Sequence, residues 1–226
     1  MNNNSINILL ATGTLLLGWF LGIIGTVINE KLKRSSTKKD IKNGIKTELT
    51  ELQIHLSSVC LLSVCEIGNF DKEFYHWLKP YFIKFYESAE FLIPKDIKDK
   101  IPKITEMDDE FVFTLIQAAF VKNITTTLPT NFTYQNITTP YIDLKINDIS
   151  LLKSSLQKVL FTLKRDINFM NGDINQIWFY HAKTFESISQ NNLAVVNANI
   201  RSIYGRIARR SKIMVNKITE ILEEIN

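Results

Sequence analysis

The stretch that decides the fold lies at the end of the chain: residues 193–225, LAVVNANIRSIYGRIARRSKIMVNKITEILEEI. Its apolar residues fall within about 80° of one another when a helix is drawn at 100° per residue. So narrow a stripe, kept over about thirty residues, is typical of a coiled-coil seam. We expect a long C-terminal helix packed on one partner, either an earlier helix or another chain. The stripe consists of Leu193, Val196, Ile200, Ile203, Ile207, Met214, Ile218, Ile221 and Ile225.

A second helix with this periodicity is expected over residues 41–59. Its apolar residues are three or four positions apart and form one narrow face. Gly68 follows and is the expected C-cap, because glycine readily adopts the left-handed conformation that ends many helices. The face consists of Ile41, Ile45, Leu49, Leu52, Leu56 and Val59.

Two further helices are expected between residues 70 and 123. The aromatic-rich segment 70–91 predicts a helix that Pro80 kinks or divides, since proline cannot donate the helical hydrogen bond. Residues 108–123 predict a helix that begins at three acidic residues, which cap its free N–H groups and complement its dipole. Its inward side chains are expected to be Phe111, Leu115, Ala118 and Val121.

The segments that remain predict one loop and two helices. Residues 123–142 are rich in Thr and Asn and lack a helical period, so we expect a long loop with room for a short β-hairpin. Residues 149–170 predict a helix capped by Asn147 or Asp148 and ended by Gly172, with another helix directly after this glycine. The chain as a whole thus predicts an all-α fold, a multi-helix bundle with long coiled-coil-like helices and one long loop.

Composition excludes several classes of protein. Of the 226 residues, 45% are apolar and 22% are charged, which is typical of folded rather than disordered chains. Two cysteines exclude a disulfide-rich secreted scaffold, and 8 Gly with 5 Pro are too few for the frequent turns of a β-sandwich. Ile, Lys and Asn make up 72 residues, a bias typical of AT-rich bacterial genomes.

The first apolar stretch of the chain is long enough to cross a membrane. Residues 6–28, INILLATGTLLLGWFLGIIGTVI, contain no charge. As a helix they extend about 34 Å, against about 30 Å for a hydrocarbon core. A signal peptide is the alternative, but it has a positive start and a small-residue cleavage site, whereas this chain begins MNNNS. We therefore expect a single transmembrane helix over 6–28.

The charge beside this span predicts its orientation. Residues 29–46 carry seven Lys and Arg against two acidic residues, and residues 1–5 carry no charge. The positive-inside rule then places the short N-terminal tail outside the bacterial inner membrane and residues 29–226 in the cytoplasm. We expect a basic juxtamembrane segment over 29–40 and a helical domain over 41–226. The basic residues expected to contact anionic lipid or a partner here are Lys31, Lys33, Arg34, Lys38 and Lys39.

Small residues recur at every fourth position within the predicted span. Thr14, Gly18, Gly22 and Thr26 form one face, on which two helix backbones can approach closely in lipid. The alternative is an ordinary lipid-facing surface, because glycine is common in membrane helices. We expect this face to pack against another helix, and so a homo-oligomer or a protein partner.

A second basic group lies on the C-terminal helix, where residues 201–217 carry six Lys and Arg and no acidic residue. It has three interpretations: a solvated face, contact with anionic lipid if this helix folds back along the N-terminal one, or contact with nucleic acid. Nucleic acid is the weakest of these interpretations, because the remainder of the chain carries a net negative charge and no known nucleic-acid-binding module is visible. The residues assigned to lipid or partner contact are Arg206, Arg209, Arg210 and Lys217.

The sequence assigns no catalytic, cofactor-binding or metal-binding residue. It contains no glycine-rich phosphate loop, no G-x-S-x-G and no H-E-x-x-H motif. His55, Cys60 and Cys65 are spaced by five residues, so on a helix successive members lie about 140° apart and cannot converge on one ion. We expect the cysteines to be buried thiols in a reducing compartment.

The layout resembles that of bacterial single-pass proteins with a short outside tail, one span, a Lys/Arg-rich exit and a helix with I-x3-I-x3-L-x2-L spacing. The similarity covers about residues 6–60, concerns the pattern alone and implies no functional residue. Our first hypothesis is a membrane-anchored, non-enzymatic interaction or sensor module. Two alternatives stay open: a membrane-acting effector, such as a toxin or phage-defence component, and a membrane-tethered enzyme acting on lipid or nucleotide.

Overall fold

The protein is helical throughout the part of the chain that its computed structural model describes. This part comprises residues 3–89, 107–125, 134–186 and 189–225, without the side chains of 3–27, 85–89, 115 and 119–125. Every regular element in it is a helix, which confirms the predicted all-α class. The helices searched there have no apolar stretch long enough to cross a membrane, and residues 6–27 of the predicted span lie outside the described side chains.

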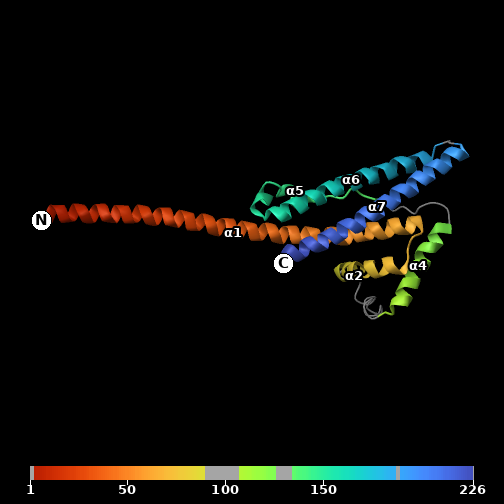
Figure 1. The fold of residues 1–226 in the computed structure, drawn as a ribbon, viewed down its shortest axis with the longest axis horizontal. Coiled ribbons are helices and arrows are strands. Elements are labelled where there is room, and N and C mark those ends of the chain that lie inside the picture. The colour runs from red at the N-terminus through yellow and green to blue at the C-terminus, as the bar shows by residue number, and fades with distance from the viewer. Residues whose placement is uncertain (1–2, 90–106, 126–133, 187–188, 226) are drawn as a thin grey trace.

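The fold is built on one helix that is longer than the bundle it supports. α1 runs from Asn3 to Ile67 without a break, so it extends about 97 Å. Its N-terminal half projects beyond the rest of the molecule, and its C-terminal half lies inside the bundle (Figure 1). Among the described side chains of α1, which begin at Ile28, Ile41 is the first that is buried, with 1% exposure. The helix predicted over 41–59 is therefore one part of a longer helix that includes the basic segment 29–40.

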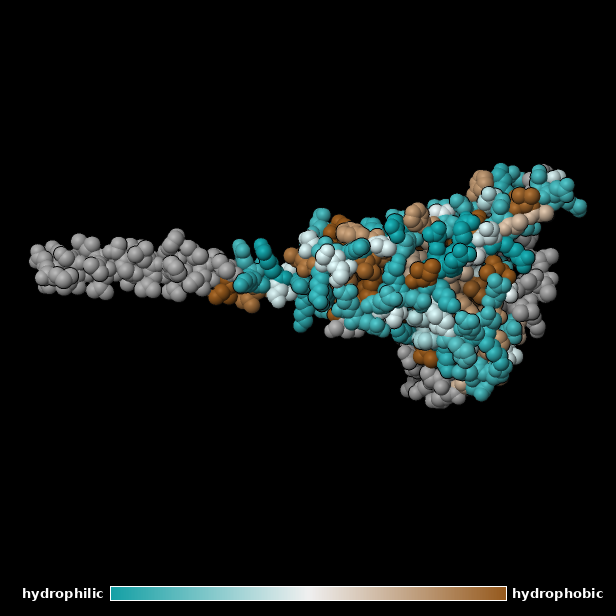
Figure 2. All heavy atoms as spheres, viewed as in Figure 1, coloured by the Kyte–Doolittle hydropathy of each residue, from teal (hydrophilic) through white to brown (hydrophobic). Residues whose placement is uncertain are grey.

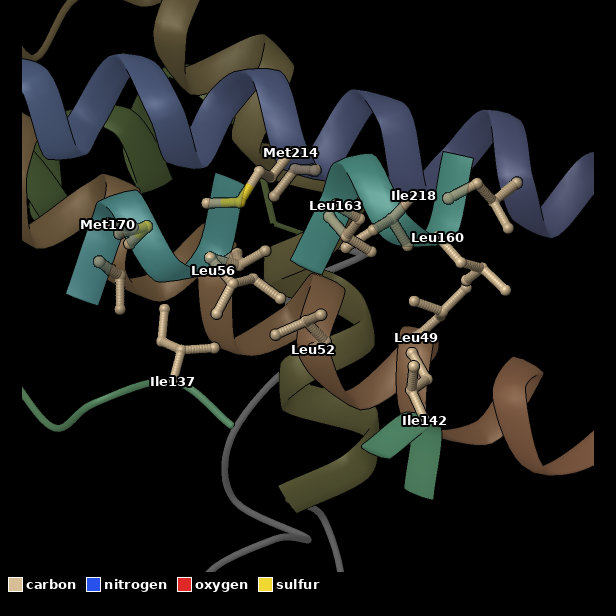
Figure 3. Packing of buried hydrophobic residues seen from close by; sticks show 14 of the residues in the cluster. Leu49, Leu52, Leu56, Ile137, Ile142, Leu160, Leu163, Met170, Met214 and Ile218 are labelled. Carbon is tan, nitrogen blue, oxygen red and sulfur yellow. The ribbon is translucent and has the colours of Figure 1, made fainter. Parts of the chain in front are cut away.

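Two more long helices complete the core. α6 runs from Ser154 to Thr184 and α7 from Gln190 to Ile225. α7 is antiparallel to both α1 and α6 (Figure 1), and side chains of the three helices meet between them (Figure 3). Burying an aliphatic side chain contributes about 1.5–3 kcal/mol, so this layer dominates the stability of the fold. Its most buried members include Leu49, Leu56, Leu160, Leu163, Met170, Ile174, Ile207 and Ile218.

The apolar stripe of the C-terminal helix packs as predicted. From Ile200 to Ile225 its residues are buried, and α7 packs along both α1 and α6. The earlier helices of the same chain are thus the partner that the stripe required. Leu193, at the start of the stripe, is 36% exposed because the hairpin of α6 and α7 projects past the end of α1 (Figure 1).

α1 ends at the predicted glycine. Gly68 has a φ of +74°, and its N–H donates to the carbonyl of Cys65 at 3.0 Å. The N–H of Asn69 donates to the carbonyl of Val64 at 3.1 Å. These two bonds form a Schellman motif, which satisfies carbonyls that the helix end leaves free. Gly68 is therefore confirmed as the C-cap.

α2, Lys72–Ala89, packs on the last turns of α1. Phe74, from the aromatic-rich segment of the sequence, is buried there. The helix continues through Pro80 as one element and is not divided there. The rings of Trp77 and Tyr81 lie 5.4 Å apart, on either side of the proline in sequence, and both pack against the core. This packing supports the helix where the proline removes a hydrogen bond.

α4, Asp109–Thr125, begins at the predicted acidic residues. Asp108 Oδ1 accepts the backbone N–H of Glu110 at 2.9 Å and that of Phe111 at 3.1 Å, so the expected cap is confirmed. The expected inward face is wrong at Phe111, which is 57% exposed, and at Ala118, which is also exposed. α4 turns a different face toward α1 and α2, and the buried members among its described side chains are Val112, Phe113 and Ile116. The other two predicted inward residues, Leu115 and Val121, lie outside the described side chains.

The predicted loop over 123–142 is shorter than expected. α5, Pro140–Leu144, begins inside its C-terminal end, and the described residues 134–139 have no regular structure. These residues run along α6, where the Asn171 side chain donates to the Ile137 carbonyl at 2.9 Å and accepts the Ile137 N–H at 2.8 Å. One side-chain amide thus supplies the pairing that a neighbouring strand supplies in a β-hairpin.

α6 does not end at Gly172, contrary to the prediction, but continues as one helix of 31 residues. It follows a short 3-10 helix, η3, Asp148–Leu151, and its N-cap position is Lys153. Glycine costs about 1 kcal/mol relative to alanine inside a helix. Met170 and Ile174, both 0% exposed, hold the helix in the core on either side of the glycine and outweigh that cost.

Candidate interaction surfaces

The stretch of α1 that precedes the bundle presents the first basic group to solvent. Residues 28–40 are exposed or half-buried, and Figure 2 shows hydrophilic side chains on this stretch beside the grey N-terminal part. The exposed apolar residues of this stretch are Ile28 and Leu32, near its junction with the predicted span, and the other residues are polar. A mainly polar helix of this kind typically bridges two bodies through solvent. Five cations are accessible here to an anionic surface, with Lys38 the least exposed: Lys31, Lys33, Arg34, Lys38 and Lys39.

The small residues of the predicted span lie on α1, ahead of this basic stretch. The side chains of Thr14, Gly18, Gly22 and Thr26 are outside those that the structure describes. Their role in helix packing stays a prediction.

The second basic group is largely engaged inside the fold. Arg206 Nε donates to Asp173 Oδ1 at 2.9 Å, and Arg206 Nη2 donates to Gln176 Oε1 at 2.9 Å. Arg210 Nε lies 3.1 Å from Asp173 Oδ2, an ion pair without a directed hydrogen bond, because that oxygen accepts none from the described residues. The Asp173 side chain is only 8% exposed, so two guanidinium groups compensate its burial between α6 and α7.

Lys217 is paired as well. Its Nζ lies 2.8 Å from Asp166 Oδ2, which joins α7 to α6 a second time. Arg209 is exposed and has no acidic partner in the described part of the chain. Three of the four residues that the sequence assigned to external contact on α7 therefore hold α7 against α6, and Arg209 alone keeps its charge free.

The register of α1 against α7 fixes how far the second basic group lies from the predicted span. Gln53 Nε2 donates to Thr219 Oγ1 at 2.8 Å, and Cys60 Sγ donates to the Ala208 carbonyl at 3.3 Å. The C-terminal helix thus folds back along α1, as the lipid interpretation required. Cys60, however, lies about 48 Å along the helix from Ile28. That is several times the screening length of about 8–10 Å, so these cations would lie beyond the reach of headgroups if the predicted span crossed a membrane upright.

A contact that the sequence analysis missed holds α5 on α1. Glu48 accepts the backbone N–H of Tyr141 at 2.7 Å and that of Ile142 at 2.9 Å, one on each carboxylate oxygen. These groups belong to the first turn of α5, whose N-cap residue Thr139 makes no side-chain cap. The Tyr141 ring lies against Gly44, where any Cβ would overlap it. We call Gly44, Glu48, Tyr141 and Ile142 the α5 clasp.

The sequence contains weak indications of two features that the sequence analysis missed, the α5 clasp and an exposed aromatic face of α6. For the clasp the signal was Pro140, because proline is favoured in the first turn of a helix. For α6 the signal was Phe161, Phe169 and Phe179, which do not share the apolar stripe that predicted the helix. These three rings are 49%, 55% and 57% exposed and point away from the core.

Burial shifts the pKa of several titratable groups inside the bundle. Cys60 and Cys65 are buried, as predicted, and burial raises the pKa of both thiols to about 12. His181 Nε2 lies 3.1 Å from the Tyr204 hydroxyl, and burial lowers the pKa of this histidine. Among the described residues, no three His, Cys, Asp or Glu side chains are grouped to hold a metal ion.

Comparison with known proteins gives no match among protein-family models, curated proteins or solved structures. The chain is therefore classed by its own geometry, as an all-α protein built on one helix that extends beyond its bundle. Its candidate functional surfaces are the basic stretch of α1 and the outward faces of the bundle.

Proposed function

We propose that this protein is a single-pass, membrane-anchored helical module that binds a partner or senses a state at the bacterial inner membrane, without catalysis. The observation that carries the proposal is the continuity of α1 from residue 3 to residue 67. The apolar residues 6–28 and the basic residues 29–40 are thus parts of one helix. The bundle begins about 20 Å beyond the apolar stretch, a distance that leaves room for lipid headgroups.

In this arrangement the N-terminal tail lies outside and residues 29–226 are cytoplasmic. The first basic group meets the anionic inner leaflet, where each Lys or Arg near the surface contributes about 1 kcal/mol. We restrict the proposed lipid contact to this group, because three cations of the second basic group are paired with α6 and the whole group lies far along α1. The face formed by Thr14, Gly18, Gly22 and Thr26 is the proposed site of association between two copies in the membrane.

Cell fractionation tests the anchor. Deleting residues 1–29 is expected to move the protein from the membrane to the soluble fraction, because the other helices searched in the described part of the chain are too short or too polar to span a bilayer. Replacing residues 6–28 by a polyleucine helix of equal length is the matched control and is expected to restore membrane association. A deleted chain that stays with the membrane would contradict the single-anchor proposal.

Cysteine labelling in intact cells tests the orientation. The native thiols give little background, because both are buried with a pKa of about 12 and the thiolate is the reactive form. A membrane-impermeant maleimide is expected to label Ser5→Cys in intact cells and Ser36→Cys only after permeabilisation. The reverse pattern would place the bundle outside.

A further inference from the structure

α6 has a second regularly spaced face, opposite the one that it buries. Its members follow one another at intervals of three or four residues, the spacing of a helix-packing seam. The three phenylalanines in this row are about half exposed, and a row of exposed apolar side chains marks an interaction site. We call the row the outer seam: Phe161, Arg165, Phe169, Gly172, Gln176, Phe179 and Lys183.

The shape of the outer seam is complementary to that of another helix. In the described part of the chain, α7, η3 and residues 134–139 pack on α6. α7 reaches the outer seam only through long side chains, with Arg206 at Gln176 and Arg210 at Phe169. Gly172, in the middle of the row, has no atom within 4 Å of the place a Cβ would take. An open groove of about 520 Å³ lies at the N-terminal end of the seam, and Lys158, Phe161 and Arg165 are among its lining residues. The phenylalanine rings on both sides of Gly172 form ridges with a groove between them, and helices pack by fitting such ridges into grooves.

The charge of the outer seam is positive. Arg165 and Lys183 belong to the row, Lys158 lines the groove, and the row contains no acidic residue. Arg165 lies 3.5 Å from Asp166, and Lys183 is paired with Glu186 at 2.8 Å, so Lys158 and the largely exposed Arg165 are the cations that a partner can reach. Its rim on α7 is basic as well, since the Arg210 guanidinium carbon lies 5.4 Å from the centre of the Phe169 ring. A partner that covers the aromatic rings therefore gains if it brings carboxylates to the rim.

Two other occupants fit this surface less well. Residues 154–217 carry ten Lys and Arg against three acidic residues, each of which is already paired with a cation. A symmetric dimer through this face would bring two surfaces of the same positive charge together. A single-stranded nucleic acid stacks neighbouring bases on neighbouring rings. Phe161, Phe169 and Phe179 are about 12 and 15 Å apart along the helix, which is too far for adjacent bases.

We infer that the outer seam is the docking site for an amphipathic helix of an acidic partner protein. The partner presents aliphatic side chains to the phenylalanine rings, brings its backbone close to Gly172, and places Asp or Glu beside Lys158 and Arg165. This inference rests on the proposed role of the protein as an interaction module, and it names the class of partner.

The probe for this inference is a labelled synthetic peptide of three heptads, with Leu at positions a and d and Glu at e and g. Its binding is measured by fluorescence anisotropy with the full chain in nanodiscs of neutral lipid, and empty nanodiscs give the baseline. The wild-type chain is expected to bind the peptide, and Arg165→Glu or Phe169→Ala to weaken binding about tenfold. The matched controls on α7 are Arg201→Glu and Ile213→Ala, two exposed positions whose substitution is expected to leave binding unchanged.

Four outcomes would overturn the inference. They are absence of binding to the wild-type chain, equal binding of a peptide with Lys in place of Glu, competition by an oligothymidine, and a wild-type dimer in sedimentation that Phe169→Ala dissociates. The substituted side chains are exposed, so circular dichroism is expected to match the wild type. If Phe169→Ala loses helical signal, Phe179→Ala tests the same seam. A negative result in this binding assay would not contradict membrane anchoring, because binding is measured on the purified chain. A negative result in the fractionation test would likewise not contradict the outer seam as a docking site.

Discussion

Replacing Glu48 by alanine is expected to release α5 from α1 and to lower the free energy of unfolding by about 2 kcal/mol. Glu48 supplies both acceptors for the first turn of α5, at 2.7 and 2.9 Å. A hydrogen bond to a charged group contributes about 1.5–3 kcal/mol, and loss of a helix cap costs about 0.5–2 kcal/mol. Glu48 is half-buried, so water replaces part of the lost bonding and the cost falls in the lower part of the combined range.

Two measurements check this prediction. Thermal unfolding followed by circular dichroism is expected to shift down by about 4–8 °C, since 1 kcal/mol corresponds to about 2–4 °C in a protein of this size. Hydrogen exchange is expected to accelerate at the amides of Tyr141 and Ile142 and to stay slow in the core of α7. Glu51→Ala removes an exposed carboxylate from the same helix and is expected to change neither measurement. If the two amides keep wild-type protection in Glu48→Ala, the clasp does not hold α5 and the reasoning is refuted.

Three further predictions follow from packing and burial. Gly44→Ala is expected to lower the free energy of unfolding by about 1–3 kcal/mol, because the new Cβ displaces a tyrosine ring. Gly205→Ala has open space around its new Cβ and is expected to raise the free energy of unfolding by about 0.5–1 kcal/mol. Urea unfolding of the two variants measures both changes. Cys60 and Cys65 are expected to resist a thiol reagent at about pH 8 until the protein is unfolded, and stability is expected to fall as the pH rises from 9.0 toward 12, because the unfolded thiols ionise first. Because the pKa of His181 is lowered in the folded protein, the unfolded state binds the proton first as the pH drops. The free energy of unfolding is therefore expected to fall as the pH drops through 6.5. In urea titrations, His181→Gln is expected to reduce this pH dependence.

The helix ends and the C-terminal seam show what the sequence specifies locally. The stripe from Ile200 to Ile225 needs only its own spacing to be recognised, and it packs as expected. Gly68 and Asp108 act on backbone groups within a few residues, so their capping roles were also readable. The prediction that α6 ends at Gly172 was wrong, although it also rested on a local rule. A glycine inside a helix costs about 1 kcal/mol, which is less than the free energy gained by burying its neighbours in the tertiary core.

The candidate surfaces were harder to predict because they depend on contacts between distant residues. The two basic groups were visible as charge, but the pairing of Arg206 with Asp173 joins residues 33 positions apart, and that of Lys217 with Asp166 joins residues 51 apart. Glu48 and Tyr141 are 93 positions apart. Only the register of packed helices determines which charges meet and which stay in solvent.

The unbroken course of α1 gives the molecule a mechanical property. Residues 29–43 contain neither glycine nor proline, so the sequence supplies no joint between the apolar stretch and the bundle. Membrane helices tilt by about 20° on average, and Ile67 lies about 58 Å along the helix from Ile28. A tilt of that size carries the far end of the bundle sideways by about 20 Å. If residues 6–28 span a membrane as proposed, α1 would act as a lever that converts a small tilt in the bilayer into a large displacement of the surfaces at its other end.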